Sequence, residues 1–261
     1  MMKALMIAST GMAAQQVSVE IIANNLANMS TTGFKRSTGE FQDLMYQTLK
    51  TAGTSTGTGT LPVGVQIGSG VRTVAVHRIF AEGEFQHTQN PLDLAIEGDG
   101  FFQVSLPDGS TAYTRAGALK QDADGKLVTS DGYPVLPSLT IPPDAISISI
   151  SPQGALSVTK AGAVAPVQIG TVDLARFTNP AGLNSLGKNL FSPTLGSGEA
   201  LTGSPGSAGF GTLLQGTLEN SNVNIAEEMV RMIIAQRAYE INSKAIQTSD
   251  EMLGMVNNLK R

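Results

Sequence analysis

Apolar side chains recur at alternating steps of three and four residues near the beginning of the chain. The series runs from Leu5 to Met29, and among its positions only Gln15 is polar. This spacing is typical of a helix that packs along another helix through an apolar seam. About 27 residues would give a helix of about 40 Å. The seam positions are Leu5, Ala8, Met12, Gln15, Val19, Ile22, Leu26 and Met29.

A second amphipathic helix is predicted at the other end of the chain. Asn224 and Glu227 have the spacing of a capping box, which marks the start of a helix. Two apolar stripes follow on different faces, and they predict more than one packing partner. An antiparallel helix pair that serves only its own globular domain stays open as an alternative. The stripes are Ile225, Met232, Tyr239, Ile246 and Leu253, and then Val230, Ile234, Ala238, Ile241, Ala245 and Met252.

Three asparagines, Asn24, Asn25 and Asn28, lie close together near the end of the first helix. Their spacing lets them share one helix face. A buried asparagine in a helix seam costs stability but fixes the register of the two helices. The other interpretation is that these residues are exposed and ease the helix to its end at Gly33, a plausible C′ residue.

The middle of the chain has the pattern of short antiparallel strands. Runs such as 71–80, 92–98, 101–106 and 146–150 are bounded by Asp-Gly turns, which favours a sandwich or an open barrel. The predicted fold class is therefore α+β: paired, coiled-coil-like N- and C-terminal α-helices with an inserted antiparallel β-rich domain. The predicted divisions are 1–33 (N-terminal helix), 34–70 (extended arm, with helical periodicity in 35–50 and low complexity in 51–60), 71–181 (β-rich domain), 182–219 (Gly/Ser-rich return linker) and 220–261 (C-terminal helix).

Composition argues against several classes of function. The net charge is −4 and the 17 basic residues form no cluster, so a nucleic-acid partner is not expected. The absence of cysteine excludes disulfides and thiolate ligands. His77 and His87 belong to no metal-binding or catalytic motif, so we predict no enzyme, cofactor, metal or small-molecule substrate. We expect no membrane-spanning segment, because no apolar run reaches about 20 residues.

Three parts of the chain resemble the signature segments of bacterial flagellar rod and hook subunits. Residues 23–36 (ANNLANMSTTGFKR) are similar to the N-terminal signature of this family. Residues 98–104 (GDGFFQV) and 112–135 resemble its middle motif, and residues 216–259 resemble its C-terminal helix. In length, and in stretches such as FQDLMYQTL and SLTIPPDAISISI, the chain is most similar to distal-rod subunits. The resemblance covers essentially the whole chain and is weakest in the simple run 51–60.

The resemblance implies a structural subunit that stacks helically into the distal part of a hollow shaft across the periplasm. Such a shaft transmits torque and conducts exported subunits. The terminal helices would line the tube and the β-rich domain would lie outside. Proximal-rod or hook subunits, and less favourably a periplasmic β-sandwich binding module, are the alternatives.

The resemblance also implies partners and a route. The partners are further copies of the chain, proximal-rod subunits, hook or hook-junction subunits and the surrounding ring proteins. Export by the flagellar type III system would leave the N-terminus uncleaved. The residues predicted to form the assembly interface are Leu5, Met12, Val19, Ile22, Asn24, Asn25, Leu26, Asn28, Met29, Ile225, Met229, Met232, Tyr239, Ile246 and Leu253.

Overall fold

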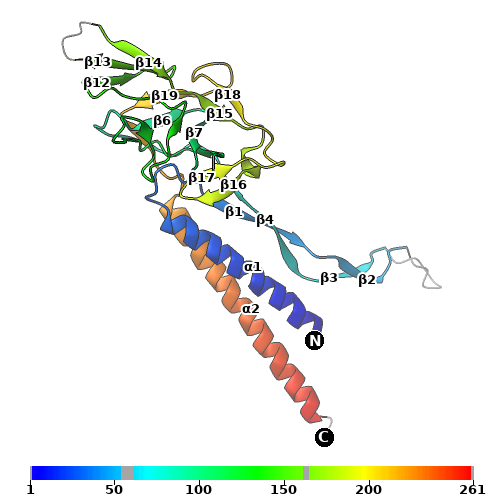
Figure 1. Ribbon diagram of the computed structural model, residues 1–261. Coiled ribbons are helices and arrows are strands. Elements are labelled where there is room, and N and C mark those ends of the chain that lie inside the picture. Colours follow the sequence, from blue (N-terminus) through cyan, green and yellow to red (C-terminus); the bar gives the residue numbers. More distant parts are fainter. Residues whose placement is uncertain (1, 54–61, 161–164, 260–261) are drawn as a thin grey trace. The chain divides into compact units, whose positions relative to one another are not determined.

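The computed structural model describes residues 2–53, 62–160 and 165–259. It divides into two compact units. Unit 1 contains Met1–Ala27, Ser37–His77 and Asn224–Arg261, and unit 2 contains Asn28–Arg36 and Arg78–Val223. The predicted α+β class is confirmed, because helices near the two ends of the chain flank a β-rich middle (Figure 1).

Unit 1 is built on two helices that lie side by side and run in opposite directions (Figure 1). They are α1 (Met2–Ala27) and α2 (Ile225–Leu259). The most buried helix positions are small or polar, with Ile22 as the largest apolar side chain. Small residues let two helix backbones approach closely. Ala8 and Ile22 belong to the seam expected from the sequence, and its positions Leu5, Met12, Gln15, Val19 and Leu26 are half-buried. The most buried members of the helix pair are Ala8, Ala14, Ile22, Asn25, Glu228, Ala235 and Ser249.

Gly11 shows how close this approach is. A Cβ atom at this position would lie 3.0 Å from Nδ2 of Asn242 on α2. Such a distance is shorter than an ordinary van der Waals contact, so glycine leaves the space that the Asn242 amide occupies. A side chain at position 11 would require the Asn242 amide to shift.

The ends of the two helices agree with the sequence to different degrees. The cap of α2 is confirmed, because Asn224 Oδ1 accepts hydrogen bonds from the backbone N–H groups of Ala226 (3.0 Å) and Glu227 (3.3 Å). The expected end of the first helix is wrong: α1 ends at Ala27. Gly33 instead lies in a later turn with φ of +69°.

The arm of unit 1 consists of two small antiparallel ribbons. β1 (Ser37–Asp43) pairs with β4 (Val71–Arg78), and β2 (Tyr46–Lys50) pairs with β3 (Val65–Gly68). The helical periodicity expected in 35–50 is therefore wrong, because pairing with strands 15 or more residues away overrides the local pattern. Most of the low-complexity run 51–60 lies outside the described residues.

In its described residues, unit 2 contains one seven-stranded sheet, one three-stranded sheet and several two-stranded ladders. The large sheet has the order β16-β17-β8-β7-β15-β18, with β11 beside β7, and the three-stranded sheet is β12-β13-β14. The described registers are antiparallel, as expected. The elements are β5 (Phe85–His87), β6 (Leu94–Glu97), β7 (Phe101–Ser105), β8 (Thr111–Thr114), β9 (Lys120–Gln121), β10 (Leu127–Val128), β11 (Val135–Leu136), β12 (Ala145–Ile150), β13 (Ala155–Lys160), β14 (Val167–Thr171), β15 (Leu174–Arg176), the 3-10 helix η1 (Pro180–Gly182), β16 (Asn184–Gly187), β17 (Leu190–Ser192), β18 (Leu201–Gly203), β19 (Thr212–Gln215) and β20 (Thr217–Glu219).

Two apolar clusters stabilise unit 2. The larger one includes the fully buried Leu94, Phe102 and Leu174. The smaller one is aromatic, and in it Tyr113 and Phe177 meet edge to face with ring centroids 4.8 Å apart. Such contacts add to the stabilisation that burial itself provides.

The expected return linker 182–219 is wrong, because it contains five strands of unit 2. Its glycine and serine content has the composition of a linker. However, β17, β18 and β19 find partners in β8, β15 and β6, which lie far away in the sequence. Non-local pairing therefore orders a segment whose local pattern carries little strand signal.

Candidate assembly interface

One face of α2 is apolar and exposed along most of the helix. Ile234 is 62% exposed and Ile241 is 67% exposed. At about 3.6 residues per turn, these two residues lie about a sixth to a third of a turn around the helix from Ala235 and Ser249, which are buried. We call this face the outer stripe; its members are Val230, Ile233, Ile234, Ile241, Met252 and Met255.

Exposure of the outer stripe to water is unfavourable in free energy for an isolated subunit. Full burial of a large aliphatic side chain contributes about 1.5–3 kcal/mol relative to exposure in water. Exposed apolar side chains gathered on one side of a helix are typical of an interaction surface, and here Arg237 and Lys244 lie among them. The stripe contains most of the second apolar pattern that the sequence analysis found on this helix.

The expected interface residues do not share one environment. The inner positions Ile22 and Asn25 are buried within the helix pair. Asn28 and Met29 follow the end of α1 and belong to unit 2. Leu5, Met12, Val19, Leu26, Met232, Ile246 and Leu253 are half-buried, whereas Asn24, Met29, Ile225, Met229 and Tyr239 are exposed and Asn28 is partly exposed.

Val19 and Tyr239, both expected at the interface, line a shared groove between the two helices. The groove has a volume of about 350 Å³. Its other lining residues are Gln16, Gln236 and Glu240. An apolar floor with polar margins could accept a further side chain, which makes this groove a second feature of unit 1 that could receive a neighbour.

Asn25 connects three elements of unit 1. Its Nδ2 donates to the backbone oxygen of Ser37 (2.9 Å) and to Oε2 of Glu228 (3.2 Å). Its Oδ1 accepts from the backbone N–H of Ser37 at 2.8 Å. The amide thus pairs with the start of β1 and with the first turn of α2. Because Asn25 and Glu228 are each 1% exposed, these bonds fix the register without competition from water.

The neighbouring asparagines behave differently. Asn24 is exposed, and Asn28 Oδ1 accepts a hydrogen bond from the Thr31 hydroxyl (3.2 Å) in the turn that follows α1. The two interpretations of the cluster therefore apply to different residues. Asn25 has the geometry of a register-fixing amide, and Asn28 takes part in the turn beyond the helix.

The arm adds further exposed apolar surface to unit 1. β2 and β3 carry exposed large apolar side chains among polar ones on a ribbon of only two strands. Such a ribbon is marginally stable by itself. Part of it forms a notch of about 150 Å³ with the start of α1, lined by Met6, Ile7 and Ile67 among others. The exposed apolar residues of the ribbon are Met45, Tyr46, Leu49, Val65 and Ile67.

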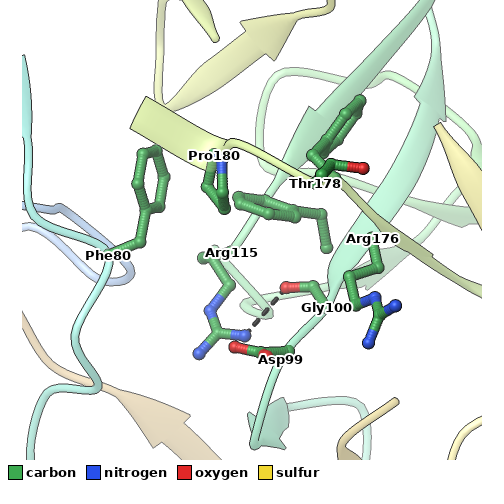
Figure 2. A pocket seen from close by; sticks show the side chains of 9 residues that line it. Phe80, Asp99, Gly100, Arg115, Arg176, Thr178 and Pro180 are labelled. Carbon is green, nitrogen blue, oxygen red and sulfur yellow. Dashed lines mark hydrogen bonds between the residues drawn. The ribbon is translucent and has the colours of Figure 1, made fainter. Parts of the chain in front are cut away.

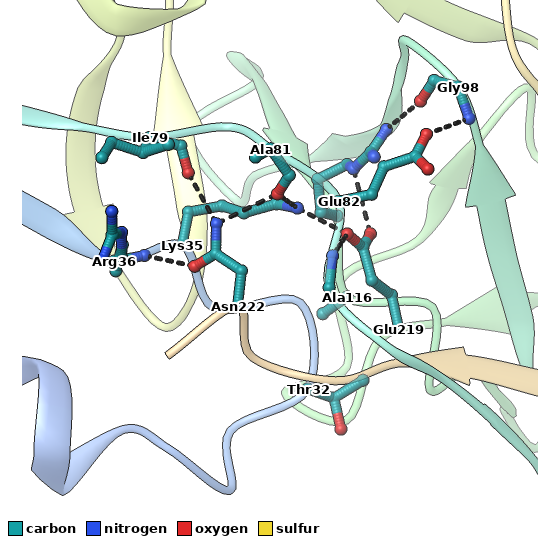
Figure 3. A network of polar contacts seen from close by, with 12 residues as sticks. Thr32, Lys35, Arg36, Ile79, Ala81, Glu82, Gly98, Ala116, Glu219 and Asn222 are labelled. Carbon is teal, nitrogen blue, oxygen red and sulfur yellow. Dashed lines mark hydrogen bonds and ion pairs between the residues drawn. The ribbon is translucent and has the colours of Figure 1, made fainter. Parts of the chain in front are cut away.

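Unit 2 contains a buried ionic cluster that the sequence analysis did not single out (Figure 3). The Glu219 carboxylate accepts from Nζ of Lys35 through Oε1 and from Nε of Arg115 through Oε2 (3.1 Å). Lys35 and Glu219 are fully buried, and Arg115 is 4% exposed. Burial lowers the pKa of Lys35, although the nearby Glu219 carboxylate opposes this change.

A pocket of unit 2 lies next to this cluster (Figure 2). Its volume is about 420 Å³, and its lining combines Phe80, Phe101 and Phe177 with Asp99 and Arg176. Arg115 also lines it, but its Nη1 already donates to the carbonyls of Gly98 and Gly100, each at 2.8 Å. Among the residues described, no group of three or more His, Cys, Asp or Glu side chains could hold a metal ion.

Helix α1 is long and apolar enough to cross a bilayer when length and composition alone are considered. Its most apolar window of 18 residues has a mean hydropathy of 1.2. The expectation from the sequence used a different criterion, an apolar run of about 20 residues, which α1 does not contain because Ser9, Thr10, Gln15 and Gln16 interrupt it. Signal sequences and the core helices of soluble proteins also meet the criterion of length and composition.

Comparisons with known proteins define the class of this chain. Residues 5–35 match the family model of the flagella basal body rod protein. Residues 95–158 match the D1 domain of the flagellar hook protein FlgE/F/G, and residues 214–259 match the C-terminal region of the flagellar basal body rod FlgEFG protein. These models follow the same order along the chain as the three segments recognised in the sequence, so the chain is an axial protein of the flagellum.

Full-length relatives narrow the class to one family. The chain is 55% identical to the flagellar basal-body rod protein FlgG of Borreliella burgdorferi, over all of both chains. It is 48% identical to FlgG of Caulobacter vibrioides over 99% of this chain and 100% of the relative. It is 32% identical to the flagellar hook-basal body complex protein FlhP of Bacillus subtilis over all of both chains. The chain belongs to the FlgG family of flagellar basal-body rod proteins, and it is a structural subunit of the distal rod.

Proposed function

We propose that the chain polymerises helically through its terminal helices into a hollow shaft that transmits torque and conducts exported subunits. The observation that carries this proposal is the outer stripe of α2, which stays exposed in a chain whose family consists of rod proteins. A contact between two different surfaces of identical subunits generates an open helical polymer when its rotation does not close. The outer stripe and the groove of α1 and α2 supply two different surfaces for such a contact.

The remaining parts of the proposal concern place and partners. The subunit spans the periplasm as part of the rod. It contacts proximal-rod subunits at one end, hook or hook-junction subunits at the other, and ring proteins around it. It leaves the cell body through the flagellar type III system without cleavage of its N-terminus. Its role is mechanical and not catalytic, and it requires neither a cofactor nor a nucleic acid.

The outer stripe can be tested by single substitutions in a host whose own copy is replaced. We expect Ile234→Asp or Ile241→Asp to abolish motility and to remove the distal rod from isolated basal bodies seen by electron microscopy. Burial of an unpaired carboxylate against a neighbour costs several kcal/mol, which is enough to prevent incorporation.

Gln247→Asp provides the matched control, because Gln247 is an exposed polar residue of α2 outside the outer stripe. This variant should assemble normally. Circular dichroism of the purified variants should show that each keeps its fold. Normal rods containing Ile234→Asp would show that the outer stripe is not an assembly surface.

A further inference from the structure

Two segments of unit 2 that are far apart in the sequence meet at the buried ionic cluster. The entry segment is residues 28–36, which follow α1, and the return segment is residues 217–222, which precede α2. Lys35 belongs to the entry segment and Glu219 to the return segment, 184 positions later. The same carboxylate therefore contacts both the beginning of unit 2 and the third member of the cluster, Arg115.

Further hydrogen bonds join the two segments at the same place (Figure 3). The backbone N–H of Gly33 donates to the backbone oxygen of Glu219 at 2.8 Å. Asn222 Oδ1 accepts from the backbone N–H of Arg36 (2.7 Å), while its Nδ2 donates to the carbonyls of Ile79 (2.9 Å) and Ala81 (3.0 Å). The entry and return segments are thus hydrogen-bonded to each other, and the return segment is also hydrogen-bonded to Ile79 and Ala81.

This junction combines many polar contacts with one buried aromatic side chain, Phe34 of the entry segment, which is 3% exposed. Within the described part of the chain, neither apolar cluster of unit 2 includes a residue of the entry or the return segment. The return strand β20 pairs with β5 alone in a two-stranded ladder. A buried segment that lies outside the apolar clusters and is held largely by polar groups can open without unfolding the core, because local openings cost less free energy than global unfolding.

We propose that the return segment is a strap and that Glu219 is its latch, so that the entry and return segments open and close together. When the latch is closed, one carboxylate compensates two buried cations. When it opens, Lys35 and Arg115 lose their shared counter-charge, and the entry segment loses both its side-chain and its backbone partners. The strap thereby couples the segment that leaves α1 to the segment that leads into α2. This inference concerns unit 2 alone and does not depend on assembly.

Amide hydrogen exchange of the full chain, followed by mass spectrometry, tests the coupling. In Glu219→Gln, we expect exchange in residues 28–36 and 217–222 to accelerate together, by about 100-fold or more, because loss of one partner leaves buried cations unpaired. Peptides from β7 and β15, in the large sheet, should change by less than about tenfold. Cleavage by trypsin after Lys35 should accelerate by the same factor as exchange, relative to cleavage at the exposed Lys120.

Glu199→Gln is the matched control, since Glu199 is an exposed glutamate of the same unit, and it should leave every rate unchanged. Asn222→Ala is a milder second variant that decides the matter if Glu219→Gln does not fold. It should accelerate exchange in both segments by equal factors. Equal acceleration throughout unit 2, acceleration of one segment without the other, or no acceleration would each overturn the strap.

Discussion

At the scale of single residues, polar groups determine the register of an otherwise apolar helix pair. Asn25 contacts β1 and α2 at once, and Gly11 leaves space for the Asn242 amide. Apolar packing tolerates small shifts along a helix, whereas a buried amide must meet its partner. The residues that specify the pairing are therefore not those that contribute the largest apolar area.

Asn25→Ala should lower the free energy of unfolding of unit 1 by roughly 2–4 kcal/mol, because it leaves the backbone groups of Ser37 and the buried Glu228 carboxylate with fewer partners. Urea denaturation followed by helical circular dichroism measures this change. Asn24→Ala is the control, and its exposed position predicts a change below about 1 kcal/mol. Equal losses in both variants would contradict the special role of Asn25.

The pKa of Lys35 leads to a second prediction at this scale. Burial holds the pKa in the folded chain below the value of 10.5, and Glu219, Arg115 and Glu82 are the charged groups that act on it. In the window below pH 10.5, the unfolded chain therefore binds more protons at Lys35 than the folded chain does. The contribution of Lys35 to stability must then rise with pH between the folded pKa and 10.5, and it stays constant below the folded pKa, where both states bind the proton.

A comparison of the natural chain with Lys35→Met isolates this effect from other titrating groups. The difference in free energy of unfolding between the two chains should change in favour of the natural chain as the pH rises from about 8 to 10. Guanidinium denaturation at each pH provides the measurement. A difference that changes in favour of Lys35→Met over this range would show that Lys35 does not have a lowered pKa.

At the scale of elements, the arm is attached to α1 by a close backbone contact. Thr10 Oγ1 accepts a hydrogen bond from the backbone N–H of Val71 at 3.3 Å. The adjacent Gly70 has φ of +119°, and a Cβ atom there would lie 2.2 Å from the same hydroxyl oxygen. A side chain at this position would therefore separate β4 from the helix.

Gly70→Ala should destabilise the contact between arm and helix by roughly 1–3 kcal/mol, from backbone strain together with steric overlap. Faster amide exchange in β3 and β4 would report the separation. Gly53→Ala is the matched control, because Gly53 also has a positive φ but a Cβ atom there meets nothing within 4 Å. If both variants behave alike, the steric overlap with Thr10 is unimportant.

At the scale of the whole molecule, the sequence predicts the helices and the strands of the middle domain well. Heptad spacing and the Asn224 cap indicate α1 and α2, and alternation with Asp-Gly turns indicates β7, β8 and β12. It fails where order comes from distant partners, as in β1, β2 and the five strands of 182–219. The ionic cluster could not be predicted from local sequence patterns, because Lys35, Arg115 and Glu219 each look like an ordinary surface charge in the sequence. They are brought together and buried only in the folded unit.

The three segments by which the family can be recognised converge on that cluster. Residues 23–36 contain Lys35, residues 112–135 contain Arg115, and residues 216–259 contain Glu219. Short motifs in separate parts of the sequence thus meet at one carboxylate in space. A pattern search along the chain finds the motifs, but only the folded unit shows why they belong together.

The distance along the sequence between Lys35 and Glu219 has a consequence for the order of events during translation. Lys35 leaves the ribosome early, whereas the acid that neutralises it is made 184 residues later. At about 5–20 residues per second, this delay is roughly 10–40 s. During most of the synthesis of the chain, Lys35 therefore has no Glu219 carboxylate with which to form its ion pair.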